Sequence, residues 1–397
     1  MSTGASTRRS ASAVVIGGGI HGLGVAFNLA SMGMRHVRVL DAGYFQGGAS
    51  GRNGTLVRGG FASLEWTRLF AFSNRRWIEL SRLLGENVMY SRRGYLIIAQ
   101  KPETAALIEP IPPMHREHGL KSELLMPHQL KTIVPALDTA SVACAVNLGD
   151  GGIAPHHAAM KGYLAACRRL GVRVDYGMPV TAIETANGQV SAVVADGERI
   201  ACDLAVIAAG AYSVDVARLA GVQMPGFAQR IEAMALEPVR PVLHQAIALP
   251  DRLCYLHQTA RGEIVGGVEV DERPQVTLTT DLPVMAATAK VYAEMFPSFA
   301  HLRILRHWAG MLHATPDWGP LLGAHPELGN LFVSAGWSYG IAGAPGATEL
   351  LARLIMTGAV PDEIRPFALD RFARGKPVAE GAIVLAPVPA ATKASAA

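Results

Sequence analysis

AVVIGGGIHG, the sequence of residues 13–22, decides the fold that this chain is predicted to adopt. A run rich in β-branched residues ends there in three glycines, and an apolar pattern suited to a helix follows over residues 23–32. Residues 37–40 then have the composition of a second strand. The segment is therefore predicted to form a strand, a helix and a parallel strand within about 30 residues, which is how a dinucleotide-binding sheet begins.

Three glycines in this segment, Gly17, Gly19 and Gly22, match the pattern GxGxxG. The first glycine allows a tight turn, the second lets the backbone approach a pyrophosphate, and the third lets the helix pack closely on the strand. Asp41 follows Gly19 by 22 residues, at the end of the second strand, where a carboxylate accepts hydrogen bonds from ribose hydroxyls. A structural turn followed by an exposed acid is the plainer alternative. FAD and NAD both use this pattern, so the motif alone leaves the choice between them open.

Composition excludes several classes of protein. Half of the 397 residues are hydrophobic and only 17% are charged, which excludes a disordered chain and allows two domains with substantial cores. Lysine and arginine exceed aspartate and glutamate by only 36 to 32, which is too small an excess to predict nucleic-acid binding. Small molecules or proteins are the expected partners.

Targeting, metal and disulfide signals are weak. No run reaches the roughly 18 consecutive apolar residues of a membrane span. Arg8 and Arg9 superficially match a twin-arginine signal, but the apolar stretch after them carries the glycine motif and has no small-residue cleavage site. We expect a soluble cytoplasmic protein without a membrane partner. The four cysteines and the histidines lack metal-ligand spacing, so we expect buried free thiols and no metal, and no cysteine has a catalytic context that would favour a hydrolase.

The rest of the chain predicts two kinds of sheet. Residues 200–209 and 331–336 are apolar strands that end in glycine, which is typical of parallel strands buried on both faces. The intervening pieces have alternating patterns broken by prolines. The predicted fold class is α/β, a Rossmann-like domain with an inserted α+β substrate domain on a mainly antiparallel sheet. The expected ranges are 11–85, 150–225 and 316–380 for the dinucleotide domain, 86–149 and 226–315 for the substrate domain, and 1–10 and 383–397 for flexible tails.

A resemblance to a known family narrows the cofactor. GGASGRNGTLVR, residues 47–58, looks like the flavin-approach segment of the D-amino-acid oxidase superfamily. Further motifs are similar to the β subunit of heterotetrameric sarcosine oxidase, and the likeness extends from about residue 13 to 375; these motifs are residues 87–94, 151–156, 308–310, 315–317 and 336–337. The resemblance implies non-covalently bound FAD that accepts a hydride from the carbon next to nitrogen in an N-methyl or N-alkyl amino acid.

The resemblance also implies site residues. Arg58 matches an arginine that pairs with the substrate carboxylate, although arginines are more often structural or surface ion pairs. Tyr255 falls where relatives have a tyrosine that faces the substrate. The residues expected to contact FAD are Gly17, Gly19, Ile20, His21, Gly22, Asp41, Ala42, Ser50, Arg52, Asn53, Thr55, Val180, Ala209, Gly210, Gly310, Asp317, Gly336, Trp337, Gly340 and Ile341.

The chain departs from the family pattern at one position. Relatives that oxidise sarcosine carry a lysine soon after the Gly-Trp that here is Gly336-Trp337, but residues 338–346 contain none. Tyr339 or His313 is expected to take over part of the carboxylate contact, or else the substrate is a larger one such as an N-methylglutamate, proline-like or opine-like amine. Residues 264–266 also lack the lysine with which relatives activate oxygen, so oxidase and dehydrogenase activity both stay open.

His156 aligns with a histidine that covalently carries FMN between subunits in the resembled β subunit. The adjacent His157 makes this assignment ambiguous by one residue, and a loop histidine is more often merely hydrogen-bonded. An FMN at a subunit interface, an α subunit and smaller subunits are thus expected from the resemblance. Two alternatives stay open: a flavin-holding subunit that relays electrons or serves as a scaffold, and a self-sufficient monomeric oxidase.

Overall fold

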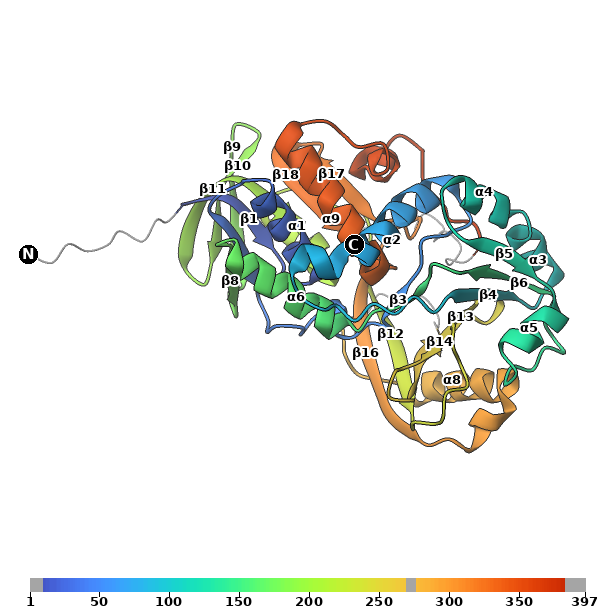
Figure 1. Cartoon of the computed structure of the whole chain (residues 1–397). Coiled ribbons are helices and arrows are strands. Elements are labelled where there is room, and N and C mark those ends of the chain that lie inside the picture. The colour runs from blue at the N-terminus through green and yellow to red at the C-terminus, as the bar shows by residue number, and fades with distance from the viewer. Residues whose placement is uncertain (1–9, 269–275, 383–397) are drawn as a thin grey trace, which may run out of the picture.

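The computed structural model describes residues 10–268 and 276–382. It has two lobes, each built around an eight-stranded sheet (Figure 1). The predicted tails fall almost wholly outside the described residues, except that Ser10 already begins the first strand.

The first sheet contains the predicted dinucleotide motif. Its main order is β17-β18-β11-β1-β2-β8, and β10 and β9 extend it from β11. Strands β18, β11, β1, β2 and β8 are mutually parallel, while β17, β10 and β9 are antiparallel to their neighbours. The apolar side chains of β1 are fully buried because the sheet is covered on both faces. The strands are β1 (Ser10–Ile16), β2 (Val37–Asp41), β8 (Arg173–Tyr176), β9 (Val180–Ala186), β10 (Gln189–Ala195), β11 (Glu198–Ile207), β17 (Leu321–His325) and β18 (Leu328–Ala335).

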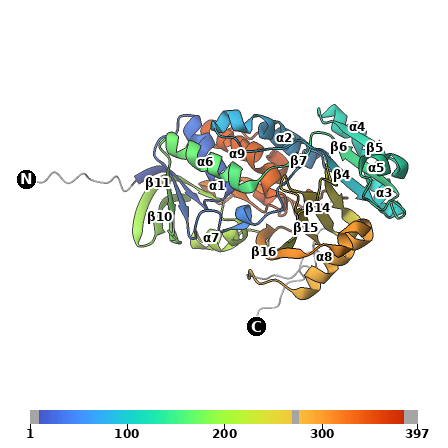
Figure 2. The same ribbon diagram turned by 60° about the horizontal axis from the view of Figure 1, so that its bottom comes forward.

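Four helices pack together on one face of this sheet, and Figures 1 and 2 both show them side by side. They are α1 (Ile20–Ser31), α2 (Leu64–Leu84), α6 (His156–Arg169) and α9 (Gly340–Thr357). Their buried side chains form one core cluster with β1 and β2. The shorter helix α7 (Ser213–Leu219) contributes to a second cluster with β9, β10 and β11. The sheet is thereby held between two apolar layers.

The second sheet has the order β16-β12-β15-β14-β13-β4-β6-β5, and every pair is antiparallel except β13 with β4. Its strands are β4 (Tyr95–Ala99), β5 (Ser122–Leu125), β6 (Cys144–Leu148), β12 (Phe227–Leu236), β13 (Ala246–Leu249), β14 (Cys254–Gln258), β15 (Ile264–Val268) and β16 (Ile304–Ala314). Helices α3 (Pro102–Ile108), α4 (Ile111–Glu117), α5 (Pro127–Ile133) and α8 (Leu282–Met295) surround it. The predicted fold class is confirmed, and the exact domain boundaries stay a prediction.

The two lobes meet where long strands of the second sheet approach turns of the first. Strands β12 and β16 pair over nearly their whole length and run from the first lobe into the second (Figure 1). A short two-stranded ladder, β3 (Leu56–Val57) with β7 (Gly152–Ile153), also lies between the lobes. This arrangement brings β16 and the chain around β3 to the carboxyl ends of the parallel strands, which is where open α/β sheets bind ligands.

Candidate functional site

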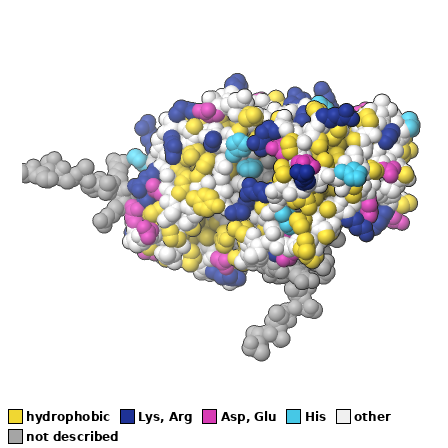
Figure 3. Space-filling view, turned by 90° about the horizontal axis from the view of Figure 1, so that it is seen from below, with side chains coloured by type: hydrophobic (Ala, Val, Ile, Leu, Met, Phe, Trp, Pro, Cys, Tyr) yellow, Lys and Arg dark blue, Asp and Glu magenta, His cyan; other side chains and the backbone are white. Residues whose placement is uncertain are grey.

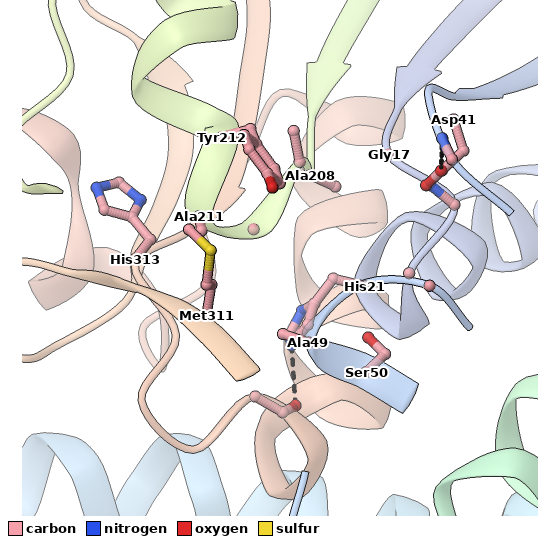
Figure 4. A pocket seen from close by; sticks show the side chains of 18 of the residues that line it. Gly17, His21, Asp41, Ala49, Ser50, Ala208, Ala211, Tyr212, Met311 and His313 are labelled. Atoms are coloured by element: carbon pink, nitrogen blue, oxygen red, sulfur yellow. Dashed lines mark hydrogen bonds between the residues drawn. The ribbon is translucent and has the colours of Figure 1, made fainter. Parts of the chain in front are cut away.

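A cavity of about 640 Å³ lies at the carboxyl ends of β1, β2 and β11. Figure 4 shows its walls, which come from the β1–α1 turn, the chain after β2, the end of β11, strand β16 and the β18–α9 turn. Most residues predicted to contact FAD line it: Gly17, Gly19, Ile20, His21, Asp41, Ala42, Ser50, Arg52, Asn53, Val180, Ala209, Gly210, Gly310, Trp337, Gly340 and Ile341.

The glycine turn after β1 is as tight as the motif requires. Gly17 has a φ of +112°, and a Cβ on it would lie 2.3 Å from the carbonyl oxygen of Ala208. A Cβ on Gly22 would lie 1.8 Å from the carbonyl oxygen of Gly17, so Gly22 allows α1 to pack on the turn without lining the cavity itself. Only glycine fits at these two positions, and the turn brings the start of α1 to the cavity wall, where a helix N-terminus suits a phosphate.

Asp41 closes the neighbouring wall at the end of β2. Its carboxylate accepts hydrogen bonds from the N–H groups of Gly18 at 2.7 Å and Gly43 at 2.8 Å. A carboxylate has about four acceptor positions, so hydrogen-bonding capacity remains for ribose hydroxyls in the cavity. The glycine cradle, this acceptor and the cavity volume fit a dinucleotide such as FAD.

Four of the predicted FAD contacts do not line the cavity: Gly22, Thr55, Asp317 and Gly336. Asp317 is occupied otherwise, since its carboxylate forms a fully buried ion pair with Arg371 at 2.7 Å. It also accepts the backbone N–H groups of Gly319 and Val378. The prediction that Asp317 contacts the cofactor directly stays a prediction, and these bonds give its carboxylate a structural role.

His313 lines the cavity, but both of its ring nitrogens are used by the backbone. The N–H of Gly336 donates to Nδ1 at 3.1 Å, so the ring proton must be on Nε2, which donates to the carbonyl oxygen of Pro225 at 2.9 Å. Burial lowers the pKa of His313 to about 4, which keeps the ring neutral. No ring nitrogen is left for a carboxylate, and the predicted part of His313 in substrate binding loses its support.

Arg58 is the unusual charge of the site. Its side chain is 1% exposed, and Nε, Nη1 and Nη2 have no hydrogen-bond acceptor among residues 10–268 and 276–382. Aromatic rings surround it instead: the centroids of Phe61, Tyr339 and Tyr95 lie 4.0, 4.5 and 5.3 Å from its Cζ atom. A surface or structural ion pair, the plainer alternative, is not what the described residues provide. The structure thus brings together Arg58 and Tyr339, which are far apart in sequence.

Thr55 lies on the chain that links the cavity to Arg58, and Tyr255 packs against that chain. A Cβ on Gly54 would lie 2.5 Å from the ring of Tyr255, so the ring of this β14 residue packs directly on the backbone. Thr55 has a φ of +61°, which is strained for a β-branched residue, and its hydroxyl lies 3.1 Å from Nε2 of His257. The only sequence signal for His257 is its spacing of two residues from Tyr255, which puts both on one face of β14.

His156 is the first residue of α6 and lies outside the cavity lining. Burial, and after it the neighbouring His157, lowers the pKa of His156 to about 4. Its Nδ1 atom is buried without a hydrogen-bond partner among the residues that the structure describes. One helical turn later, Met160 does line the cavity, so α6 connects the two places.

No group of three or more His, Cys, Asp or Glu side chains in the described ranges is arranged to hold a metal ion. No helix among residues 10–268 and 276–382 has the length and apolar character to cross a lipid bilayer. Basic and acidic side chains are interspersed on the face seen from below (Figure 3).

Comparison with known proteins agrees with this geometry. The chain is 29% identical to the sarcosine oxidase subunit beta of Rhodobacter capsulatus over 91% of this chain and 89% of that protein. It is 27% identical to the 4-methylaminobutanoate oxidase (formaldehyde-forming) of Paenarthrobacter nicotinovorans over 90% of this chain but 45% of that protein. The crystal structure of L-proline dehydrogenase from P. horikoshii superposes with a TM-score of 0.88 and 26% identity, and covers 92% of this chain and 99% of that one.

These findings confirm the resemblance inferred from the motifs. A model of the family described as FAD dependent oxidoreductase matches residues 12–354. The match includes the glycine turn, the walls of the cavity and Arg58. The chain belongs to the FAD dependent oxidoreductase family.

Proposed function

We propose that this chain oxidises a secondary amine that carries a carboxylate, such as an N-methyl or N-alkyl amino acid. The family supplies the cofactor, and relatives named for sarcosine, 4-methylaminobutanoate and dimethylglycine support an amine substrate. The observation that carries the proposal is Arg58, a buried guanidinium without a hydrogen-bond acceptor among the described residues, close to the FAD cavity.

Arg58 needs an anion for a physical reason. Burying a charge without a partner is costly, and a carboxylate that pairs with both edges of the fork removes that cost. The rings of Phe61 and Tyr339 pack against the guanidinium and restrict its orientation, so it is prepared for a planar ligand. The carboxylate of an amino acid is such a ligand, and binding it there orients the rest of the substrate.

The reacting end of the substrate then extends toward the cavity. The chain from Arg58 back through Thr55 leads to Asn53 and Arg52, which line the cavity. FAD, when bound, accepts a hydride from the carbon next to the amine nitrogen. The protein contributes orientation, exclusion of water and a cation that favours the neutral form of the amine, because a like charge nearby disfavours its protonation.

The size of the substrate follows from what surrounds Arg58. No lysine accompanies the β18–α9 turn, and the ring of Tyr339 packs on the guanidinium instead. One guanidinium supports one carboxylate, so sarcosine-like monocarboxylates are the first substrates to test. Proline belongs with these monocarboxylates, whereas N-methylglutamate and opine-like amines follow, since their second carboxylate needs other residues.

We also propose that the chain works as the β subunit of a hetero-oligomer with an FMN next to His156. The names of the sarcosine oxidase relatives support a multi-subunit enzyme. The neutral ring of His156, whose Nδ1 has no partner among the described residues, supports a ligand at that place. Its test is the flavin content and native mass of the enzyme purified from its source, with His156→Ala and His157→Ala compared. The cytoplasmic location stays a prediction.

The function is tested by mixing the FAD-loaded protein with amines in the absence of oxygen and following flavin absorbance. Matched pairs separate the two parts of the proposal: sarcosine against dimethylamine, and proline against pyrrolidine, which differ only in the carboxylate. We expect bleaching by the carboxylated member of at least one pair, and not by its partner. If no member of either pair bleaches the flavin, and N-methylglutamate does not bleach it either, the result would point instead to a flavin-holding subunit that relays electrons.

A further inference from the structure

A closed set of side-chain contacts joins the two turns that form opposite parts of the FAD cavity. His21 is the second residue of α1, directly after the glycine turn, and Trp337 belongs to the turn between β18 and α9. Their rings stack with centroids 4.2 Å apart and an interplanar angle of 24°. Ser334, at the end of β18, lies between them in the hydrogen-bond network, and Gly340 begins α9. Figure 4 shows His21 and its bond to the backbone of the α9 start beside the cavity.

The direction of each hydrogen bond follows from donor chemistry. An indole N–H only donates, so Nε1 of Trp337 donates to the hydroxyl oxygen of Ser334 at 3.2 Å. A carbonyl oxygen only accepts, so Nε2 of His21 carries the ring proton and donates to Gly340 at 2.9 Å. In the neutral ring Nδ1 is then an acceptor, and the Ser334 hydroxyl donates to it at 3.1 Å. One arrangement of protons satisfies every group.

Neutral His21 is required for this arrangement. His21 is 8% exposed and Ser334 is 1% exposed, so water does not replace a lost bond. Burial lowers the pKa of His21 to about 3, although the bond to Gly340 opposes the shift. A protonated ring would place a second donor against the Ser334 hydroxyl and break the sequence of bonds.

We propose that His21 is a positioning residue that locks Trp337 and the start of α9 in place at the cavity, through Ser334 on one side and Gly340 on the other. Its two ring nitrogens are both used by protein groups, so it holds the FAD site in shape and does not hydrogen-bond FAD itself. This inference rests on the FAD site and is independent of the amine proposal.

The linked contacts of His21, Ser334, Trp337 and Gly340, called the relay below, affect how tightly the cofactor binds. Trp337, Gly340 and Ile341 all line the cavity, and each is attached to a turn that His21 ties to the glycine motif. Losing the relay frees these groups to move before FAD binds, so binding must then order them. Part of the binding energy is spent on this ordering, so losing the His21 hydrogen bonds is expected to weaken FAD binding roughly 10-fold, which corresponds to about 1.4 kcal/mol.

The test uses purified apoprotein and added FAD, with the dissociation constant and the visible spectrum of bound flavin as readouts and no amine present. His21→Leu removes both bonds. His21→Gln restores an acceptor and a donor on one side chain. Ser334→Ala removes the middle group, and Trp337→Phe keeps the stacked ring without the N–H. His128→Leu, at an exposed histidine of α5 outside the cavity lining, is the matched control.

We expect His21→Leu and Ser334→Ala each to weaken FAD binding about 10-fold and to change the flavin spectrum, with the double variant no worse than His21→Leu alone, because coupled groups are not additive. His21→Gln should stay within about 3-fold of the parent, and His128→Leu should bind FAD as the parent does. Additive effects of His21→Leu and Ser334→Ala, or parent-like binding by both, would overturn the proposal. If His21→Leu does not fold, Ser334→Ala and Trp337→Phe against the parent still decide it.

Discussion

The guanidinium carbon of Arg58 lies 4.0 Å from the centroid of the Phe61 ring, in a pocket from which water is excluded. An aromatic ring stabilises a desolvated cation by about 2 kcal/mol, which is less than the cost of burying the charge without a counter-ion. The ligand-free protein therefore has a buried charge without a counter-ion among the described residues, and a bound carboxylate would offset its cost.

Replacing Arg58 by Met separates binding from folding. We expect the affinity for carboxylated amines or carboxylate inhibitors to fall at least 10-fold, because a charged hydrogen-bonding pair is lost. The melting temperature of the ligand-free protein should not fall and should rise, because an unpaired buried charge is removed. Titration by flavin absorbance and thermal unfolding measure the two effects. Arg75→Met, at an exposed arginine 5.7 Å from the Phe72 ring, should change neither; a large drop in melting temperature for Arg58→Met would contradict this account.

The glycine turn makes a steric prediction. A methyl group at Gly22 would lie 1.8 Å from the carbonyl oxygen of Gly17, so Gly22→Ala must displace α1 from the turn. We expect purified Gly22→Ala to contain less than about a tenth of the FAD of the parent, since phosphate binding needs the helix N-terminus in place. Gly329→Ala is the control, because a Cβ there meets nothing within 4 Å. Flavin content per chain is the measurement, and near-normal content in Gly22→Ala would be incompatible with this geometry.

The ion pair between Asp317 and Arg371 predicts a difference in stability. Both side chains are almost fully buried, so Arg371→Met leaves a buried carboxylate without its counter-ion. We expect the free energy of unfolding to fall by about 3–5 kcal/mol. Arg374→Met, which breaks an exposed pair with Asp370, should cost less than about 1 kcal/mol. Denaturant unfolding of the two variants side by side measures the contrast, and equal effects would show that the buried pair is not the main support of this segment.

Buried histidines make the fold sensitive to acid. Burial is the largest cause that lowers the pKa, to about 3 for His21 and about 4 for His115, His257 and His313. Their usual pKa is about 6.5, so between roughly pH 6.5 and 4 the unfolded chain binds more protons than the folded chain. The stability present above pH 6.5 is therefore lost as the pH falls through this window.

We expect the melting temperature of the apoprotein to be nearly constant from pH 8 to 7 and to fall steadily from pH 6.5 to 4.5. His115→Asn removes one titrating group and should make the decline shallower. Thermal unfolding followed by circular dichroism at half-unit pH steps is sufficient. A melting temperature that holds steady down to pH 4.5 would mean that these histidines bind protons equally in the folded and the unfolded chain, which contradicts the prediction.

The sequence was sufficient for the parts of the site that are local. The β1–α1 turn and Asp41 depend on a strand, a glycine turn and a second strand that follow one another directly, so pattern and spacing predicted their place. Arg58 was identified through resemblance. Its burial was not predictable, because the surrounding rings come from residues far apart in the chain, such as Tyr95 and Tyr339.

Two of the predicted site residues have partners that lie far from them in the sequence. Asp317 lies in a motif that the resemblance associates with the cofactor, but its ion-pair partner Arg371 follows 54 residues later. The sequence makes His313 a reasonable polar candidate, but backbone groups of Pro225 and Gly336 form hydrogen bonds with both of its ring nitrogens. Hydrogen-bond saturation by the backbone is a property of tertiary structure, and side-chain identity alone does not reveal it.

The central strand β1 is the first in the chain, but its neighbour β11 pairs in turn with β18, close to the other end. The whole segment from β1 to β18 must therefore be synthesised before this sheet is complete and before α9 can close the dinucleotide site. Until then the glycine turn has no opposite wall, and early in synthesis β1 pairs only with β2, whose other neighbour is β8. Flavin loading is consequently a late event in biogenesis, and chains that stop short of Gly340 should emerge without colour and be recognised by proteases as unfinished.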